Sequence, residues 1–302
     1  MSIATAPADV TLPRRALPRT RPWYLDVWVQ MVRRKPLGTM GGAIVLVMLA
    51  AAVGAEWISP YGFSQTSLLE RFIAVSKAHW LGTDQLGRDV LTRLIYGARI
   101  SLYVGFGAVA LGSALATIIG ILSAYFGGRT DMLVQRGVDA WMAFPPLLLL
   151  MSIMSLVGPS VWNITIVLGV AFGIQNSRVV RGVALGIKEN TYIESARAMG
   201  SGHLAIAARH ILPNVMPTII VVATTGLSTV ILTEASLSFL GLGVPPPYPT
   251  WGGMLSLAGL DHMYQAPWLA IWPAVALSLA VFGFNMLGDG LRDLLDPRLK
   301  GG

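Results

Sequence analysis

The stretch ISLYVGFGAVALGSALATIIGILSAYF, residues 100–126, runs for 27 residues without a single Asp, Glu, Lys or Arg. About 20 predominantly apolar residues are enough to cross the hydrocarbon core of a bilayer as a helix. This stretch therefore predicts a membrane-spanning helix. The whole chain agrees, because only 12% of its 302 residues are charged and its mean hydropathy is +0.63. Soluble domains carry about 25% charged residues.

Five further segments have, or nearly have, the length and apolar composition of a span: residues 37–58, 140–157, 161–177, 213–240 and 266–288. The second and third of these come from one uncharged run that is too long for a single crossing. Gly158 and Pro159 favour a turn in that run. The sequence thus predicts an all-α integral membrane protein with six transmembrane helices. The proline-rich segment after the fifth span is expected to be an ordered loop at the membrane face.

The distribution of Lys and Arg predicts the orientation of these spans. Six spans place four segments on one side: 1–36, 127–139, 178–211 and 289–302. These segments hold 17 of the 22 basic residues. Basic residues are enriched on the cytoplasmic side of membranes, so both termini are expected there. The net charge of +7 is explained in the same way, by residues that flank apolar runs, and we expect no nucleic-acid partner.

The predicted organisation is a cytoplasmic N-terminal tail over 1–36, a first transmembrane helix over 37–58 and an extracytoplasmic segment over 59–99. A core with five transmembrane helices follows over 100–302. A cleaved signal peptide over 1–55 is the alternative for the N-terminus. It is disfavoured because the segment before the apolar run is too long and the run itself has the length of a span.

Residues 192–214, YIESARAMGSGHLAIAARHILPN, are unusually polar for this chain. Thr191 and Glu194 fit a capping box, which predicts that a helix starts there. Gly200 is expected to end this helix. Ser201 is then expected to cap a second helix that runs to Pro213.

Tyr192, Ala196 and Met199 are spaced i, i+4 and i+7 on the first of these helices, so they share one face. A small apolar face of this kind could bind in a groove on another protein. The helix could equally pack on its own bundle. The spacing alone leaves both interpretations open.

The same stretch resembles the EAA loop of ABC importer permeases, in which EAA is followed by three residues, Gly, nine residues and I-x-L-P. The residues that match are Glu194, Ala196, Gly200, Leu212 and Pro213. Ser195 and His210 depart from the pattern. Other stretches resemble the C-type permease subunit of dipeptide and oligopeptide importers: LGTDQLGRDVLTRLIYGARISL (81–102), TEASLSFLGLG (233–243), PTWGGML (249–255) and GDGLRDLLDPRLK (288–300).

This resemblance covers about residues 30–300 and implies the ABC importer permease (MetI-like) fold. It also implies a homologous B-type permease partner, two ATP-binding subunits and an extracytoplasmic solute-binding protein, all acting in a bacterial or archaeal inner membrane. Residues 188–212 become the coupling loop that docks on an ATPase subunit. The coupling residues that it implies are Glu194, Ala196, Met199, Gly200, Leu212 and Pro213.

The chain contains no G-x-x-x-x-G-K-[ST] phosphate loop and no Gly-Lys pair. ATP and Mg²⁺ are therefore expected on partner subunits, and we expect neither enzymatic activity nor a cofactor on this chain. The absence of cysteine excludes thiolate metal sites. The four histidines, His79, His203, His210 and His262, lack ligand spacing, so no metal is expected.

The fifth span contains several polar residues. Thr225, Thr229 and Thr233 follow helical spacing and could line a path for peptides, or their hydroxyls could bond neighbouring helices. Glu234 in the same span is expected near the outer boundary of the membrane, where it could line the pathway exit or act as a structural partner. The sequence slightly favours the structural role.

Asp84 and Asp89 lie on either side of Arg88 before the second span. Hard cations need six or more oxygen ligands, so a cation site is disfavoured. We expect Asp89 to cap an amphipathic helix over 90–99, and contact with a binding protein is the second interpretation of this segment.

Three alternatives to a peptide importer remain. A secondary transporter or ion channel usually carries ionisable residues near the midplane of its spans, and only Glu234 is a candidate. A membrane enzyme is disfavoured because no paired acid and base groups are visible. An importer of nickel, glutathione or antimicrobial peptides from the same family is not excluded by the sequence.

Overall fold

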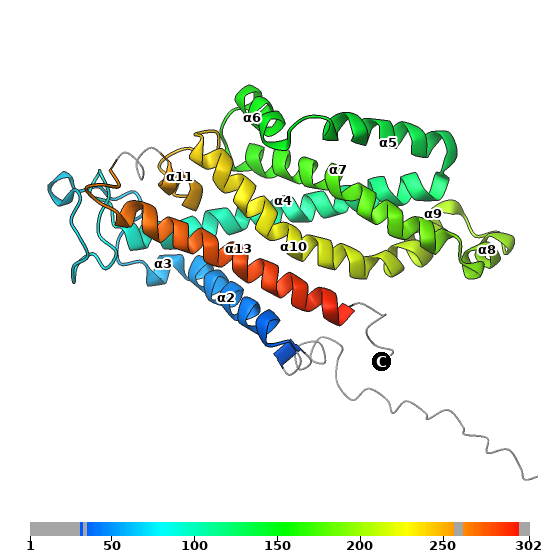
Figure 1. Cartoon of the computed structure of the whole chain (residues 1–302), viewed down its shortest axis with the longest axis horizontal. Coiled ribbons are helices and arrows are strands. Elements are labelled where there is room, and N and C mark those ends of the chain that lie inside the picture. The colour runs from blue at the N-terminus through cyan, green and yellow to red at the C-terminus, as the bar shows by residue number, and fades with distance from the viewer. Residues whose placement is uncertain (1–30, 33–34, 257–261, 296–302) are drawn as a thin grey trace, which may run out of the picture.

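The computed structural model describes residues 31–32, 35–256 and 262–295. Long helices lie side by side along one axis of the molecule (Figure 1). The described helices are α2 (Pro36–Val53), α3 (Ala55–Ile58), α4 (Val90–Phe126), α5 (Gly128–Met142), α6 (Pro146–Val157), α7 (Val161–Lys188), α8 (Thr191–Ala198), α9 (His203–Ile206), α10 (Leu212–Phe239), α11 (Trp251–Leu255) and α13 (Trp268–Leu295). A 3₁₀ turn at Leu68–Glu70 and a π turn at Ala207–Ile211 complete the set.

Small residues allow the two central helices, α4 and α7, to approach closely. A Cβ atom added to Gly112 on α4 would lie 2.6 Å from the carbonyl oxygen of Gly169 on α7. Membrane helices associate without a hydrophobic driving force between them, so close backbone contact at small residues is a main source of their packing energy. The interior core continues from this contact toward α10 and α13, where Ile231 and Phe284 are fully buried.

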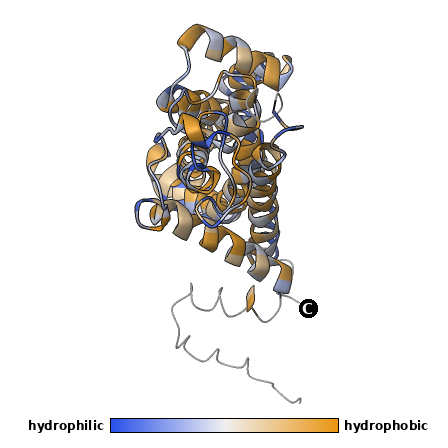
Figure 2. Ribbon diagram, turned by 90° about the vertical axis from the view of Figure 1, so that its left-hand side faces the viewer, coloured by the Kyte–Doolittle hydropathy of each residue, from blue (hydrophilic) through white to orange (hydrophobic). Residues whose placement is uncertain are grey.

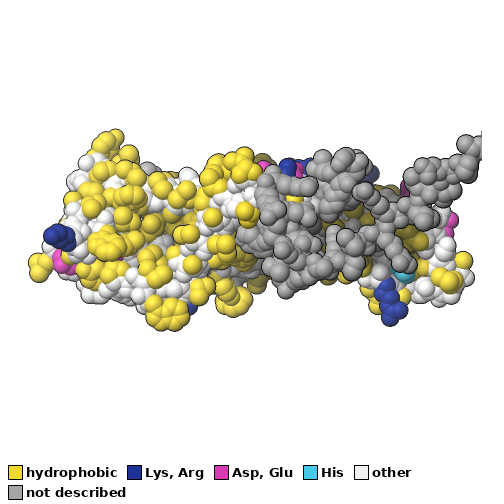
Figure 3. Space-filling model, turned by 90° about the horizontal axis from the view of Figure 1, so that it is seen from below, with side chains coloured by type: hydrophobic (Ala, Val, Ile, Leu, Met, Phe, Trp, Pro, Cys, Tyr) yellow, Lys and Arg dark blue, Asp and Glu magenta, His cyan; other side chains and the backbone are white. Residues whose placement is uncertain are grey.

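The outer surface of the bundle is apolar. Figure 2 shows hydrophobic residues on helices across the bundle, and in Figure 3 hydrophobic side chains cover much of the described surface in view. Val47 and Val53 on α2 are 69% and 70% exposed. Exposed apolar side chains on this scale fit a protein that faces lipid rather than water.

Among the described residues, four helices are long and apolar enough to cross a membrane: α2, α4, α13 and the continuous helix over His203–Phe239. A fifth crossing results if α5 and α6, which meet at an angle of 88°, are one broken span. The expected number of six is therefore not confirmed. Helix α7 is also 28 residues long, but it includes the charged residues Arg178, Arg181 and Lys188.

The expected third span over 140–157 is not one continuous helix. Helix α5 already begins at Gly128, in the segment 127–139 that is expected outside the spans, and α6 has only 12 residues. A helix of that length covers about 18 Å, well short of the hydrocarbon core. The break lies at Pro145 and Pro146, because proline cannot continue a helix that precedes it.

The expected boundary between the segment 90–99 and the second span is also wrong. Helix α4 starts at Val90, so residues 90–99 are its first turns rather than a separate helix at the end of the segment 59–99. The expected cap is confirmed, since Asp89 Oδ2 accepts a hydrogen bond from the Thr92 amide at 2.8 Å. The predicted tail over 1–36 lies almost entirely outside the described residues.

Candidate functional site: the 188–214 turn and the groove beside α10

The polar stretch 188–214 folds into a turn of two helices at one end of the bundle (Figure 1). The capping-box prediction is wrong, because Asn190 is the N-cap of α8 and no side chain bonds the free amides there. The Asn190 side chain instead donates to the carbonyl of Ile187 at 3.0 Å, at the end of α7. Thr191 is the first helical residue, and Glu194 lies in the first turn, where a carboxylate is favoured by the helix dipole.

Gly200 ends α8, as predicted. Its φ of +83° is the left-handed conformation that glycine adopts readily. The amides of Gly200 and Ser201 donate to the carbonyls of Arg197 and Ala196 at 2.9 and 3.1 Å. This is the paired bonding of a Schellman motif. Gly202, not Ser201, is the N-cap of the second helix.

The second helix does not stop at Pro213. It continues from His203 through the π turn into α10, giving one helix over His203–Phe239. The Leu212 amide donates to the carbonyl of Ala207, five residues back. Proline has no amide hydrogen to offer the preceding turn, and this wider turn accommodates Pro213 near the start of α10. Leu212 is half-buried and Pro213 is exposed.

One side of the turn is buried against the bundle. Ile193 and Ala196 of α8 pack with Ile206, Ile211 and Val215. Of the three residues that share the predicted face, Ala196 is only 3% exposed and packs on the bundle, whereas Tyr192 and Met199 are exposed. Its small side chain lets α8 lie close to the second helix.

The other side of the turn exposes apolar side chains. Tyr192 is 43% exposed, Met199 80% and Leu204 82%. We call these three residues the turn patch. Clusters of exposed apolar side chains mark interaction sites, and these three come from the segments on either side of Gly200.

Three contacts hold the turn to the C-terminal end of α4. The hydroxyl of Tyr125 is 2.8 Å from Nδ1 of His203. The guanidinium of Arg197 lies over the Tyr125 ring, 5.2 Å from its centroid. Lys188 Nζ donates to the carbonyl of Ala124 at 3.1 Å, which satisfies one of the carbonyls left unpaired at a helix end. Sequence analysis missed Tyr125, because its partners are more than 70 residues away.

A groove of about 510 Å³ lies between α5, α6, α7 and α10. Thr229 and Thr233 line it together with Ser236 and Gln175, and the rest of the lining is mainly apolar. Thr225 does not join them, since it packs against Gly288 of α13. The Thr233 hydroxyl donates to the carbonyl of Thr229 at 2.8 Å, so its oxygen remains available as an acceptor.

Glu234 lies away from the groove, in the interior between α10 and α4, and is 0% exposed. Its carboxylate accepts hydrogen bonds from the hydroxyls of Ser101 and Ser238 at 3.1 and 2.6 Å. An acidic side chain in an apolar span needs such partners. In this structure Glu234 is a structural partner and does not line the groove.

Comparison with known proteins identifies the chain. Residues 116–301 match the model of the family described as binding-protein-dependent transport system inner membrane component. The chain belongs to this family. It is 41% identical over 280 residues to a glutathione transport system permease protein of Pectobacterium atrosepticum, with 92% of each chain covered. It is 39% identical over 279 residues to a dipeptide transport system permease protein of Alkalihalophilus pseudofirmus, with 92% of this chain and 91% of the relative covered.

Membership of the binding-protein-dependent inner membrane components confirms the prediction of an ABC importer permease. Such a permease is a non-catalytic, multi-pass membrane component of a larger transport system. The all-helical structure agrees with this family, and among the described residues only an isolated bridge between Thr83 and Asp89 has β pairing.

Proposed function

We propose that this permease forms half of the translocation pathway for dipeptides and oligopeptides, together with a homologous B-type permease. Two ATP-binding subunits would hold ATP and Mg²⁺, and one of them would bind the turn patch. A solute-binding protein would deliver the peptide from outside. Relatives named for dipeptide and glutathione transport support a short peptide as the substrate class. Glutathione is the second candidate substrate for the same reason.

The observation that carries this proposal is the two-sided construction of the 188–214 turn. Ile193 and Ala196 anchor it to the bundle, while Met199 and Leu204 project from it. A turn that only closed a connection would not need large apolar side chains at 80% and 82% exposure. They fit an anchor that enters a groove on another protein.

The same construction accounts for the transfer of movement. The Schellman motif fixes the angle between the two helices, and Tyr125 ties both to α4. A displacement of the turn patch would therefore move α4 and α10 together as a rigid body. The groove beside Thr229 would change shape because α10 forms one of its walls.

The lack of cysteine makes a direct test simple. Met199→Cys and Leu204→Cys, introduced singly and labelled with a thiol-reactive photo-crosslinker, should form crosslinks to an ATP-binding subunit in the purified transporter. Leu69→Cys is a matched control, because Leu69 is 99% exposed but lies in the outer segment. Crosslinks from Leu69 and none from the turn patch would contradict both the docking site and the proposed cytoplasmic orientation.

Substrate choice needs a separate measurement. Uptake of a labelled dipeptide into vesicles should be competed by unlabelled dipeptides and tripeptides. Competition by glutathione alone would move the assignment to glutathione. ATP-independent uptake driven by an ion gradient would contradict the importer mechanism.

A further inference from the structure

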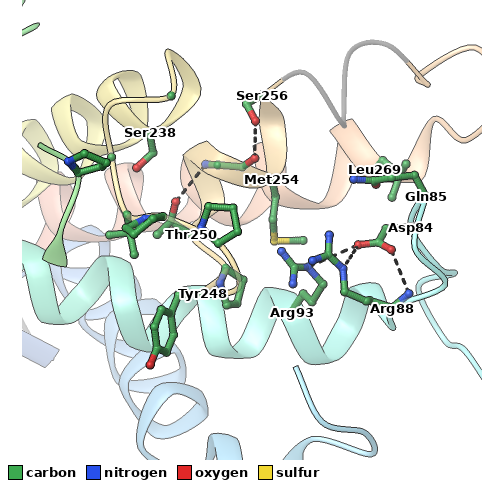
Figure 4. Close-up of a pocket in the computed structure, with 18 of the residues that line it drawn as sticks. Asp84, Gln85, Arg88, Arg93, Ser238, Tyr248, Thr250, Met254, Ser256 and Leu269 are labelled. Atoms are coloured by element: carbon green, nitrogen blue, oxygen red, sulfur yellow. Dashed lines mark hydrogen bonds and ion pairs between the residues drawn. The ribbon is translucent and has the colours of Figure 1, made fainter. Parts of the chain in front are cut away.

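A second pocket, of about 370 Å³, lies at the end of the molecule opposite to the 188–214 turn. Its walls come from residues 84–88, the first turns of α4, the segment 241–250 and α11 (Figure 4). Helix α4 connects the two ends, since it starts at Val90 beside this pocket and ends at Phe126 beside the turn. The pocket therefore belongs to the outer face if the turn is cytoplasmic.

Three charged residues line the pocket, and two of them are arginines. Arg88 Nε donates to Asp84 Oδ2 at 2.6 Å, and Arg93 Nε lies 3.7 Å from the same oxygen. The two guanidinium groups lie side by side next to Met254 (Figure 4). The lining consequently contains one more positive charge than negative charge.

Asp84, the one carboxylate in the pocket lining, already accepts several hydrogen bonds. Asp84 Oδ1 accepts the amides of Leu86 and Arg88 at 2.8 and 3.0 Å, which holds the turn before α4. The two arginine side chains are only 12% and 10% exposed, so water screens their repulsion weakly. Two neighbouring cations of low exposure are stabilised by an additional anion.

Arg88 and Arg93 differ in how many of their N–H donors are already bonded to other residues. Arg93 donates to the carbonyls of Phe63 and Pro247 at 3.1 and 3.4 Å, so it joins the outer segment to the loop after α10. Among the described residues, the side chain of Arg88 makes only the contact with Asp84. Its guanidinium has five N–H donors in a fixed fork, and the terminal ones remain for a ligand.

We propose that this pocket binds a carboxylate, and that an acidic side chain of the solute-binding protein supplies it. Arg88 would bind the carboxylate in the bidentate geometry that guanidinium favours, and Arg93 would contribute charge. This inference rests on the proposed function for the identity of the partner, but the carboxylate site itself does not.

The position of the pocket favours the solute-binding protein over the transported peptide as the source of the carboxylate. Ser236 lines the groove beside α10, whereas Ser238 lines this pocket. Residues two apart on a helix point about 200° away from each other. A peptide that moves along the groove would therefore stay on the opposite face of α10.

The first experiment tests the carboxylate site without any partner. Glutarate at millimolar concentration should raise the melting temperature of the purified permease, and the neutral analogue glutaramide should not. Arg88→Gln should abolish the shift. Arg71→Gln is the matched control, because Arg71 is an exposed cation of the same outer segment that lies over Phe72 and is absent from the pocket lining. Equal shifts in both variants would overturn the site.

The second experiment tests the occupant, with the solute-binding protein that co-purifies with the wild-type transporter as the probe. Its affinity for the transporter should fall at least tenfold in Arg88→Gln, partly recover in Arg88→Lys and stay unchanged in Arg71→Gln. Arg88→Glu should be rescued by a reversal of one acidic residue on the binding protein. Melting temperatures without glutarate show whether each variant is folded.

Two outcomes would overturn the assignment to the binding protein. One is loss of the glutarate response in Arg88→Gln with full affinity for the binding protein. The other is a stronger thermal shift with a dipeptide than with its C-terminal amide, which would make the substrate the source. If no solute-binding protein accompanies the wild-type permease, the proposed function fails, and the glutarate result still decides the carboxylate site.

Discussion

Glu234 on α10 and Ser101 on α4 meet in the interior of the bundle, with 3.1 Å between the carboxylate Oε2 and the serine hydroxyl. The second carboxylate oxygen accepts the hydroxyl of Ser238 at 2.6 Å, and the glutamate has no exposed surface. This contact joins α10, which leaves the 188–214 turn, to α4, which ends beside that turn. It gives the only acidic side chain of the fifth predicted span a structural role.

Substitution of Glu234 should therefore affect stability. Glu234→Ala leaves two hydroxyls without their acceptor and opens a cavity, which should lower the free energy of unfolding by roughly 2–3 kcal/mol. Glu234→Gln keeps the size and one acceptor oxygen and should cost less. Thermal unfolding in detergent measures both. Wild-type stability in Glu234→Ala would show that the carboxylate is not a structural partner.

Gly200 and Gly202 allow a test of the turn in which one substitution is the control for the other. A Cβ atom at either position would meet nothing within 4 Å, but only Gly200 has a positive φ. Gly200→Val should cost about 1–3 kcal/mol of backbone strain and lower crosslinking of Met199→Cys to the ATP-binding subunit. Gly202→Val, in extended backbone at φ −65° and ψ 152°, should leave crosslinking unchanged. The same loss in both variants would contradict the account of Gly200.

A large side chain placed in the groove beside α10 should affect transport rather than stability. Thr229→Trp places a large side chain in the groove of about 510 Å³ and should reduce peptide uptake severalfold. Thr224→Trp is the control, because Thr224 lies on the same helix outside the groove lining. Uptake measured in vesicles with the complete transporter compares them. Normal uptake by Thr229→Trp would remove the groove from the pathway.

The contacts of Tyr125 predict a local change at the turn. Tyr125→Phe removes the hydrogen bond to His203 and keeps the ring under Arg197, so the turn should lose about 1 kcal/mol of stability. Tyr125→Leu should lose more, because the cation–π contact disappears as well. Amide hydrogen exchange over residues 191–206 should rise in that order. Tyr103→Phe, at a 51% exposed position of the same helix, should leave this exchange unaltered.

The sequence predicted the helical class and the end of α8 well, because both depend on local signals. A long uncharged run and a glycine after a helix have few other interpretations. Prediction from the sequence failed where tertiary packing or the chemistry of proline determined the local structure. Ala196 shares the spacing of Tyr192 and Met199, but contact with Ile206 and Ile211 turns it inward. The π turn before Pro213 had no sequence signal that separated it from a helix end.

Helix α4 runs for 37 residues without a proline or a break, from the pocket lined by Arg88 and Arg93 to the contacts of Tyr125 with the turn. At 1.5 Å per residue it is about 55 Å long, nearly twice the thickness of the hydrocarbon core. A rigid helix of that length is held by the 188–214 turn at Tyr125 and is capped by Asp89 at its other end, near Arg93. It cannot tilt on one side of the membrane alone. If the proposed solute-binding protein binds at the pocket and the proposed ATP-binding subunit binds at the turn, the two act on opposite ends of one rigid helix.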